Sequence, residues 1–164
     1  MVAKPLYLPV TFLALLLGLG LCSCGKKVSK EAAGLLATTA LAAKERAITF
    51  AAVAPQLHAK AKPEEPGVQR FAGAHAQRLA AQAKALADFN EALSKDELDK
   101  STIRQIGSLA ESAKASAENF RALTPKVDWK WPEFSETHQA ALDLQAQQLA
   151  QLYEAVKPKE KPAP

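Results

Sequence analysis

The sequence has few aromatic residues and few β-branched residues, and this shortage bears first on the fold class. Aromatic residues make up 6% of the chain, and alanine is its commonest residue. Strands favour β-branched and aromatic side chains, whereas alanine has the highest helix propensity. The composition therefore argues against a β protein and predicts helix through most of the chain.

The sequence also lacks the motifs of common enzyme chemistry. It has no Gly-x-Ser-x-Gly nucleophile elbow, no phosphate-binding glycine loop and no His-Glu-x-x-His zinc helix. Adjacent carboxylates such as Glu64 and Glu65 precede a predicted helix, where the helix dipole accounts for acidic residues. We therefore expect no catalytic residue and predict that the protein is not an enzyme.

One uncharged, leucine-rich run is present, from Val10 to Leu21, and the single lysine Lys4 precedes it. This layout is typical of a secretory signal, and the run is too short to span a bilayer, which takes roughly 20 apolar residues. The run ends at Leu21-Cys22-Ser23-Cys24, with leucine three places before a cysteine and a small serine directly before it. This arrangement resembles the lipobox of bacterial lipoproteins.

The resemblance implies that residues 1–23 are a signal peptide and that Cys24 is the lipidated N-terminus of the mature chain. Cys24 would carry a thioether-linked diacylglycerol and an N-acyl chain. Cys22 is the rival site, but it would put Leu21 where the lipobox has a small residue. With Cys22 removed and Cys24 acylated, no thiol remains for a disulfide, a metal or a nucleophile. We therefore expect no cofactor beyond the lipid.

The same resemblance implies a lipid-anchored protein of the bacterial cell envelope. Under the sorting rule of enteric lipoproteins, the absence of aspartate directly after Cys24 favours the periplasmic face of the outer membrane. Other lineages need not follow this rule. The sequence therefore predicts a membrane contact through the lipid, with the remainder of the chain on the periplasmic side.

The net charge of +4 comes from the two ends of the chain, residues 1–31 and 157–164. Both are rich in lysine, and without them acidic residues slightly outnumber basic ones. A nucleic-acid partner therefore has no support. We expect residues 24–31 to be a lipidated tether and residues 157–164 to be a disordered tail, since the tail has nothing to bury.

Apolar residues recur at steps of three and four in four stretches, which is typical of amphipathic helices. Pro55 should kink or shorten the first helix, because it supplies no backbone N–H, and Arg46 falls within the apolar arc of that helix. Short connections then predict an all-α, up-down-up-down four-helix bundle over residues 32–156. We find no internal repeat beyond this helical pattern. The expected helices span Val28 to about Ala61, Val68 to about Leu93, about Lys95 to Leu123, and Glu133 to Val156.

Three histidines, His58, His75 and His138, are predicted near the bundle end that faces away from the membrane. His58 is expected in the last turn of the first helix. His75 and His138 lie on apolar faces of two helices that run parallel across the core, so they should reach similar depth. Facing imidazoles in a bundle can hold haem or a divalent metal. Core histidines satisfied by hydrogen bonds are the simpler interpretation, since no Cys-x-x-Cys-His or Glu-x-x-His motif accompanies them.

Trp129 and Trp131 belong to the only segment with strand-like alternation, which puts them on one side together with Val127. An exposed tryptophan pair could bind a partner protein or stack on a sugar. Alternatively, the three side chains fold back as a lid over the open end of the bundle, because a small core needs its aromatic residues.

Three functions remain open. Our leading hypothesis is a non-catalytic, lipid-anchored envelope protein that acts as a structural or protein-interaction module, with another envelope protein or a cell-wall component as its partner. The first alternative is a metal- or haem-binding bundle that uses the histidines. The second alternative is an immunity or inhibitor lipoprotein.

Overall fold

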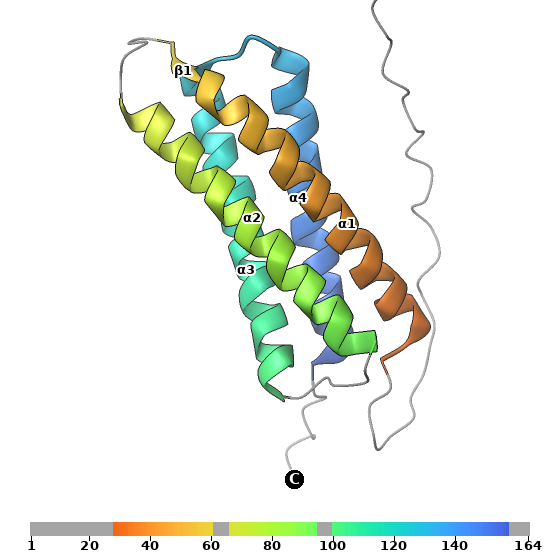
Figure 1. Ribbon diagram of the computed structural model, residues 1–164. Helices are drawn as coiled ribbons and strands as arrows, with labels where there is room; N and C mark the ends of the chain where they lie inside the picture. The colour runs from red at the N-terminus through yellow and green to blue at the C-terminus, as the bar shows by residue number, and fades with distance from the viewer. Residues whose placement is uncertain (1–27, 61–65, 95–99, 158–164) are drawn as a thin grey trace, which may run out of the picture.

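The computed structural model describes residues 28–60, 66–94 and 100–157, which form a bundle of four antiparallel helices (Figure 1). The expected all-α four-helix bundle is therefore confirmed. α1 and α2 pack as one hairpin and α3 and α4 as a second, and the contacts within each hairpin are more extensive than those between hairpins. Residues 1–27 and 158–164, with the lipobox, Cys24 and the expected tail, lie outside the described residues. The helices are α1 (Lys30–Val53), α2 (Pro66–Ser94), α3 (Lys100–Leu123) and α4 (Pro132–Val156).

α1 ends before Ala61, the end expected for the first helix, close to the position where Pro55 was expected to kink or shorten it. The α-helix stops at Val53 and continues only as a 3-10 turn, η1 (Ala54–Gln56), because Pro55 has no N–H to continue the helical ladder. A second 3-10 turn, η2 (Thr124–Lys126), follows α3 in the same way. The expectation that the first helix reaches Ala61 is therefore wrong.

Two short strands close the end of the bundle opposite the start of α1 (Figure 1). β1 (His58–Ala59) pairs antiparallel with β2 (Val127–Asp128), and His58 lies opposite Asp128. The connection after α1 and the connection after α3 thus share one end of the bundle, as predicted. The placement of His58 in a helical turn is wrong, because the backbone becomes extended after η1.

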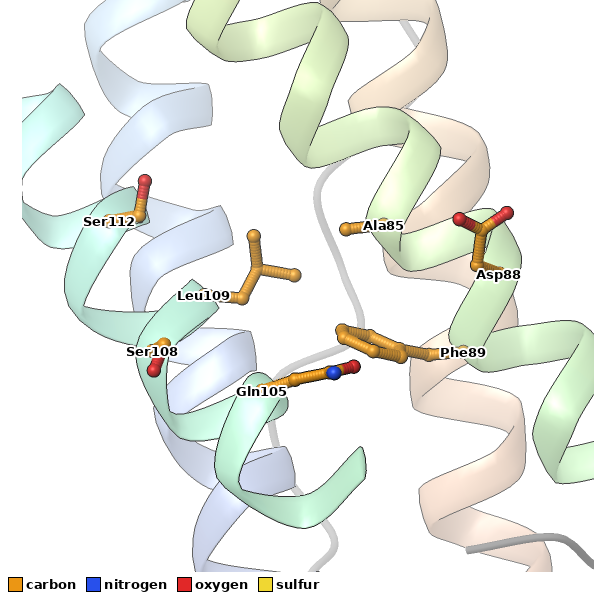
Figure 2. A pocket seen from close by; sticks show the side chains of 7 residues that line it. All are labelled: Ala85, Asp88, Phe89, Gln105, Ser108, Leu109 and Ser112. Atoms are coloured by element: carbon orange, nitrogen blue, oxygen red, sulfur yellow. The ribbon is translucent and has the colours of Figure 1, made fainter. Parts of the chain in front are cut away.

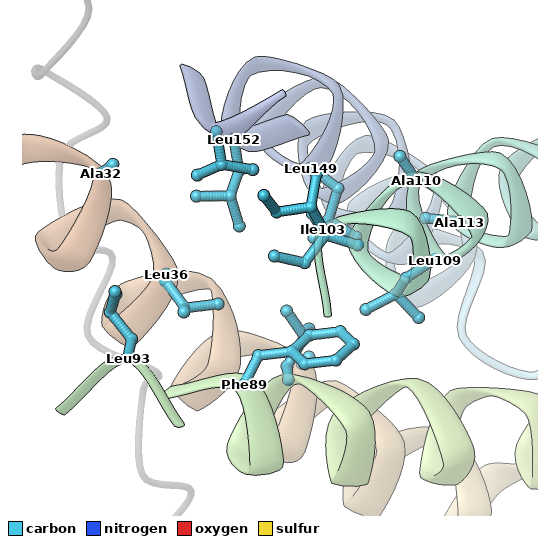
Figure 3. Close-up of a cluster of buried hydrophobic side chains, with 14 residues drawn as sticks. Ala32, Leu36, Phe89, Leu93, Ile103, Leu109, Ala110, Ala113, Leu149 and Leu152 are labelled. Carbon is cyan, nitrogen blue, oxygen red and sulfur yellow. The ribbon is translucent and has the colours of Figure 1, made fainter. Parts of the chain in front are cut away.

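The apolar core consists of two clusters, one toward each end of the bundle. Figure 3 shows the cluster near the start of α1, where side chains of all four helices converge. The second cluster lies toward β1 and β2 and contains Phe50 and Phe120. In the first half of α1 the buried stripe is rotated by one residue from the expected one, since Leu36 is buried and Leu35 is only half-buried, whereas Phe50 is buried as expected. Alanine lies on every side of this helix, so periodicity alone left its rotation open.

The two hairpins are internal repeats, so the expectation of no repeat is wrong. The residues of α4 that match α2 follow at a constant spacing of 63 residues. A second constant spacing relates α1 to α3. The matched pairs are Phe71 with Phe134, His75 with His138, Leu79 with Leu142, Gln82 with Gln145, Leu86 with Leu149, Ala43 with Ala113, Ala47 with Ala117, Phe50 with Phe120, and Pro55 with Pro125.

The arrangement of the hairpins follows this repeat. His58 and Asp128 are counterparts at the same spacing as Phe50 and Phe120, and they face each other in the β1–β2 pair. A residue that faces its own counterpart lies on a two-fold axis. The two hairpins are therefore related by a pseudo-two-fold axis that enters the bundle between β1 and β2.

Candidate functional site: a buried histidine pair

His75 of α2 and His138 of α4 meet inside the bundle. Their Nε2 atoms are 3.3 Å apart, and only 1% and 4% of the two residues is exposed. The prediction that the two histidines reach similar depth is confirmed. Because they are counterparts in the repeat, the pseudo-two-fold axis passes between them.

Four phenylalanine rings enclose the two imidazoles. The ring centroid of Phe50 lies 4.7 Å from the His75 imidazole and 4.8 Å from the His138 imidazole. Phe120 contacts the same two rings at 5.4 and 4.7 Å. Outside them, Phe71 stacks on the first imidazole at 5.7 Å and Phe134 on the second at 5.4 Å. The enclosure is symmetric, since these four residues are two pairs of counterparts.

This environment keeps both imidazoles neutral. Burial lowers the pKa of His75 to about 4 and the pKa of His138 to about 3, because desolvation penalises the imidazolium form. Positive charge acts in the same direction: Arg78 lowers the pKa of His75, and the pKa of His138 is lowered by His75 when His75 is protonated and by Arg46. In the neutral pair, one Nε2–H can donate to the facing Nε2, and the Nδ1 of His75 is buried without a hydrogen-bond partner among the described residues.

Arg46 is the one charged side chain of α1 that turns toward the core. Its Nε and Nη1 atoms are buried and have no hydrogen-bond partner among the described residues. Burial lowers the pKa of its guanidinium. Arg46 corresponds to Ser116 in the repeat, so its charge is an asymmetric feature placed near His138.

A second polar layer lies two helical turns along α2 and α4 from the histidine pair. Gln145 Nε2 donates to Gln82 Oε1 at 3.1 Å, and Gln82 Nε2 donates to the hydroxyl oxygens of Ser112 and Ser116 at 3.0 and 3.1 Å. Both glutamines and Ser116 are buried. Sequence reasoning missed this layer. The 63-residue spacing that the glutamines share with the histidines was the signal that could have found it.

The other predicted site residues lie apart from this pair. His58 is exposed on β1. Trp129 takes the lid position, since its Nε1–H donates to the Thr124 carbonyl at 3.0 Å and its ring lies 5.6 Å from Phe120. Trp131 is 44% exposed, with the Lys130 Nζ 4.8 Å from its ring centroid. The lid interpretation thus fits Val127 and Trp129, while Trp131 points to the outside.

A shallow groove of about 360 Å³ lies between α2 and α3, away from the histidines. Figure 2 shows Phe89 of α2 and Gln105 and Leu109 of α3 directed toward one another across it. Asp88 is the only titratable residue among those that line the groove. It therefore offers no set of groups for acid–base chemistry.

The histidine pair does not provide a ready site for haem. A macrocycle cannot lie between two nitrogen atoms 3.3 Å apart whose rings both pack against Phe50 and Phe120. Within residues 28–60, 66–94 and 100–157, no three or more His, Cys, Asp or Glu side chains are grouped to hold a metal ion. Any ion at the pair would therefore be bound by two protein ligands.

None of the helices in the described part of the chain has the length and apolar character needed to cross a bilayer.

Comparison with known proteins finds no relative of this chain. The chain matches no protein-family model, no curated protein and no solved structure.

Proposed function

We propose that the protein is a non-catalytic, lipid-anchored component of the bacterial cell envelope whose α1 surface binds another envelope protein. The observation that supports this proposal is a pair of exposed apolar side chains on α1. Leu41 is 61% exposed and Ile48 is 63% exposed. Their counterparts on α3 are Glu111 and Glu118, both exposed. The repeat therefore carries acidic residues in one hairpin where it carries apolar residues in the other.

The surface around Leu41 and Ile48 has features that would let a partner helix pack against it. Leu41 and Ile48 are two turns apart and so lie on one side of α1. A groove of about 520 Å³ between α1 and α2 adjoins Leu41, and alanines form much of its lining. Small side chains let two helices approach closely. Lys44 of the same groove provides a positive charge between the two apolar residues. The partner we expect is an amphipathic helix with apolar residues against α1 and an acidic residue opposite Lys44.

The proposed lipid anchor would also set the orientation of the α1 surface relative to the membrane. Cys24 precedes the start of α1 at Lys30 by only a few residues, and an extended residue spans at most about 3.6 Å. A lipid on Cys24 would therefore hold the start of α1 at the membrane surface, with β1 and β2 directed away from it. The α1 surface would then run roughly along the membrane normal, within reach of a second envelope protein.

Site-specific photo-crosslinking in cells tests the interaction. A photoreactive amino acid at position 41 should give one defined adduct with another protein, and the same probe at position 111 should not. Substituting Ile48→Glu, which copies the α3 residue, should remove the adduct, whereas Glu118→Gln should leave it unchanged. Adducts that are the same at both positions, or an adduct only with a second copy of this chain, would contradict the proposal. Identifying the adduct by mass spectrometry separates a structural partner from the secreted toxin that an immunity protein would bind.

Intact-mass analysis of membrane-extracted protein tests the anchor. We expect a chain that begins at Cys24 and carries a diacylglycerol and an acyl chain. A Cys24→Ala variant should keep residues 1–23 and lose the lipid. A wild-type protein in which neither Cys22 nor Cys24 carries lipid would exclude the lipid anchor without bearing on the α1 surface.

A further inference from the structure

We propose that the His75–His138 pair is a binding site for the monovalent cation Cu(I), held by the two Nε2 atoms alone. This proposal is independent of the lipid anchor and of the α1 surface. It rests on the distance between the two nitrogens, on the lack of further ligands around them and on the charges that face them.

The distance between the nitrogens is in the range that a metal ion can bridge. With metal–nitrogen bonds of about 2.0–2.1 Å, the observed separation of 3.3 Å corresponds to bonds that meet near the tetrahedral angle. A linear two-coordinate ion needs nitrogens about 4 Å apart. The two Nε2 atoms would thus have to separate by less than 1 Å from their distance in the metal-free pair.

The surroundings favour an ion that is satisfied by two ligands. A tetrahedral Zn²⁺ site needs four ligands, and the atoms around the pair belong to phenylalanine rings. The amide side chains of Gln82 and Gln145 lie two helical turns away, about 10 Å along the axis. Arg46 acts on His138, but its guanidinium is positive and has no lone pair to offer an ion. Cu(I) is stable with two ligands, and imidazole suits copper. The faces of the phenylalanine rings also attract a cation.

The charges around the pair favour a monovalent ion over a divalent one. The two imidazoles are neutral ligands and bring no negative charge. Arg46 faces the pair from α1 and Arg78 acts on it from α2, and both are positive. Repulsion from these charges is twice as large for a divalent ion as for Cu(I). No acidic group contributes to the charge interactions of either histidine.

Binding requires no net release of a proton. Without metal, one imidazole of the neutral pair carries its proton on Nε2, between the two rings. When Cu(I) binds, both Nε2 lone pairs bind the ion, and that proton is carried on Nδ1 of the same ring. The copper stays in the Cu(I) state, so no oxidant or reductant takes part.

Competition with a coloured Cu(I) chelator under anaerobic conditions tests the site. The full chain with Cys22→Ser and Cys24→Ser, purified in detergent, should withdraw one equivalent of Cu(I) and little Zn²⁺. His75→Leu and His138→Leu should each weaken Cu(I) binding at least tenfold. His58→Ala is the matched control and should bind as the parent does. Equal loss in the His58 variant, no binding by the parent, or equally tight Zn²⁺ binding would overturn the proposal.

X-ray absorption of the copper-loaded parent protein keeps the test independent of whether the variants fold. Two imidazole nitrogens and no other near scatterer are expected. A third nitrogen or oxygen neighbour would mean that the ion is bound elsewhere, at the surface or at the lysine-rich ends, and would overturn the assignment.

Discussion

Acidification should destabilise this bundle through the histidine pair. In the unfolded chain each histidine has a pKa near the model-peptide value of 6.5, whereas in the fold the pKa is about 4 for His75 and about 3 for His138. Between these values the unfolded state binds more protons than the folded state, so stability falls as the pH falls. Each histidine should cost about 2 kcal/mol between pH 7.5 and pH 5, and the pair about 4 kcal/mol. A domain of this size has a total stability of about 5–15 kcal/mol.

Urea denaturation followed by circular dichroism at several pH values between 7.5 and 5 measures this loss. The free energy of unfolding should fall steadily below pH 6.5, before most carboxylates titrate. The double variant His75→Leu with His138→Leu should show a much flatter pH dependence, because leucine cannot bind a proton. Constant stability of the wild-type protein down to pH 5, or the full loss in the double variant, would refute the reasoning.

Two further predictions concern the core. Gln145→Leu should destabilise the protein by about 1–3 kcal/mol, since it leaves Gln82 Oε1 buried without a donor, whereas replacing both glutamines with leucine should restore most of that loss. Urea titrations of the wild type, the single variant and the double variant would decide, and equal stability of the single variant and the wild type would contradict this account. A Cβ at position 73 meets nothing within 4 Å, so Gly73→Ala should stabilise α2 by about 1 kcal/mol. A Cβ at position 107 would lie 2.9 Å from the Tyr153 ring, so Gly107→Ala should destabilise the protein. Thermal melts in which the Gly107 variant has the higher melting temperature of the two would show that the ring moves freely.

Much of the fold could be predicted because its signals are local. Steps of three and four among apolar residues predicted four helices, and Pro55 marked the place where the first helix would be kinked or shortened. The meeting of His75 and His138 also followed, because second and fourth helices of an up-down bundle run parallel across the core. Topology alone was enough to bring these two residues together.

The rest depended on packing that the sequence pattern does not fix. Alanine on every side of α1 left its rotation open, so Leu36 was missed as a core residue. His58 was assigned to a helix because the pairing of β1 with β2 links residues far apart in the chain. The repeat was missed because its two spacings differ, since the connection after α3 is shorter than the connection after α1.

The glutamine layer was hidden for a physical reason. A buried glutamine is costly without a hydrogen-bond partner, so Gln82 and Gln145 considered singly read as surface residues. In the core, Gln82 accepts from its own counterpart Gln145 and donates to the hydroxyls of Ser112 and Ser116, so partners far apart in the chain offset the cost of its burial. The repeat is therefore the feature that links the sequence to both polar layers.

The central claim is that His75 and His138 form a neutral, hydrogen-bonded pair on the axis between two repeated hairpins. Nitrogen NMR of histidine-labelled full-length protein tests it most directly. We expect both imidazoles to keep the chemical shifts of neutral rings from pH 7.5 to pH 5 for as long as the protein is folded, with a scalar coupling between their Nε2 nuclei. Two histidines that both titrate near pH 6.5 in the folded protein, without such a coupling, would contradict it.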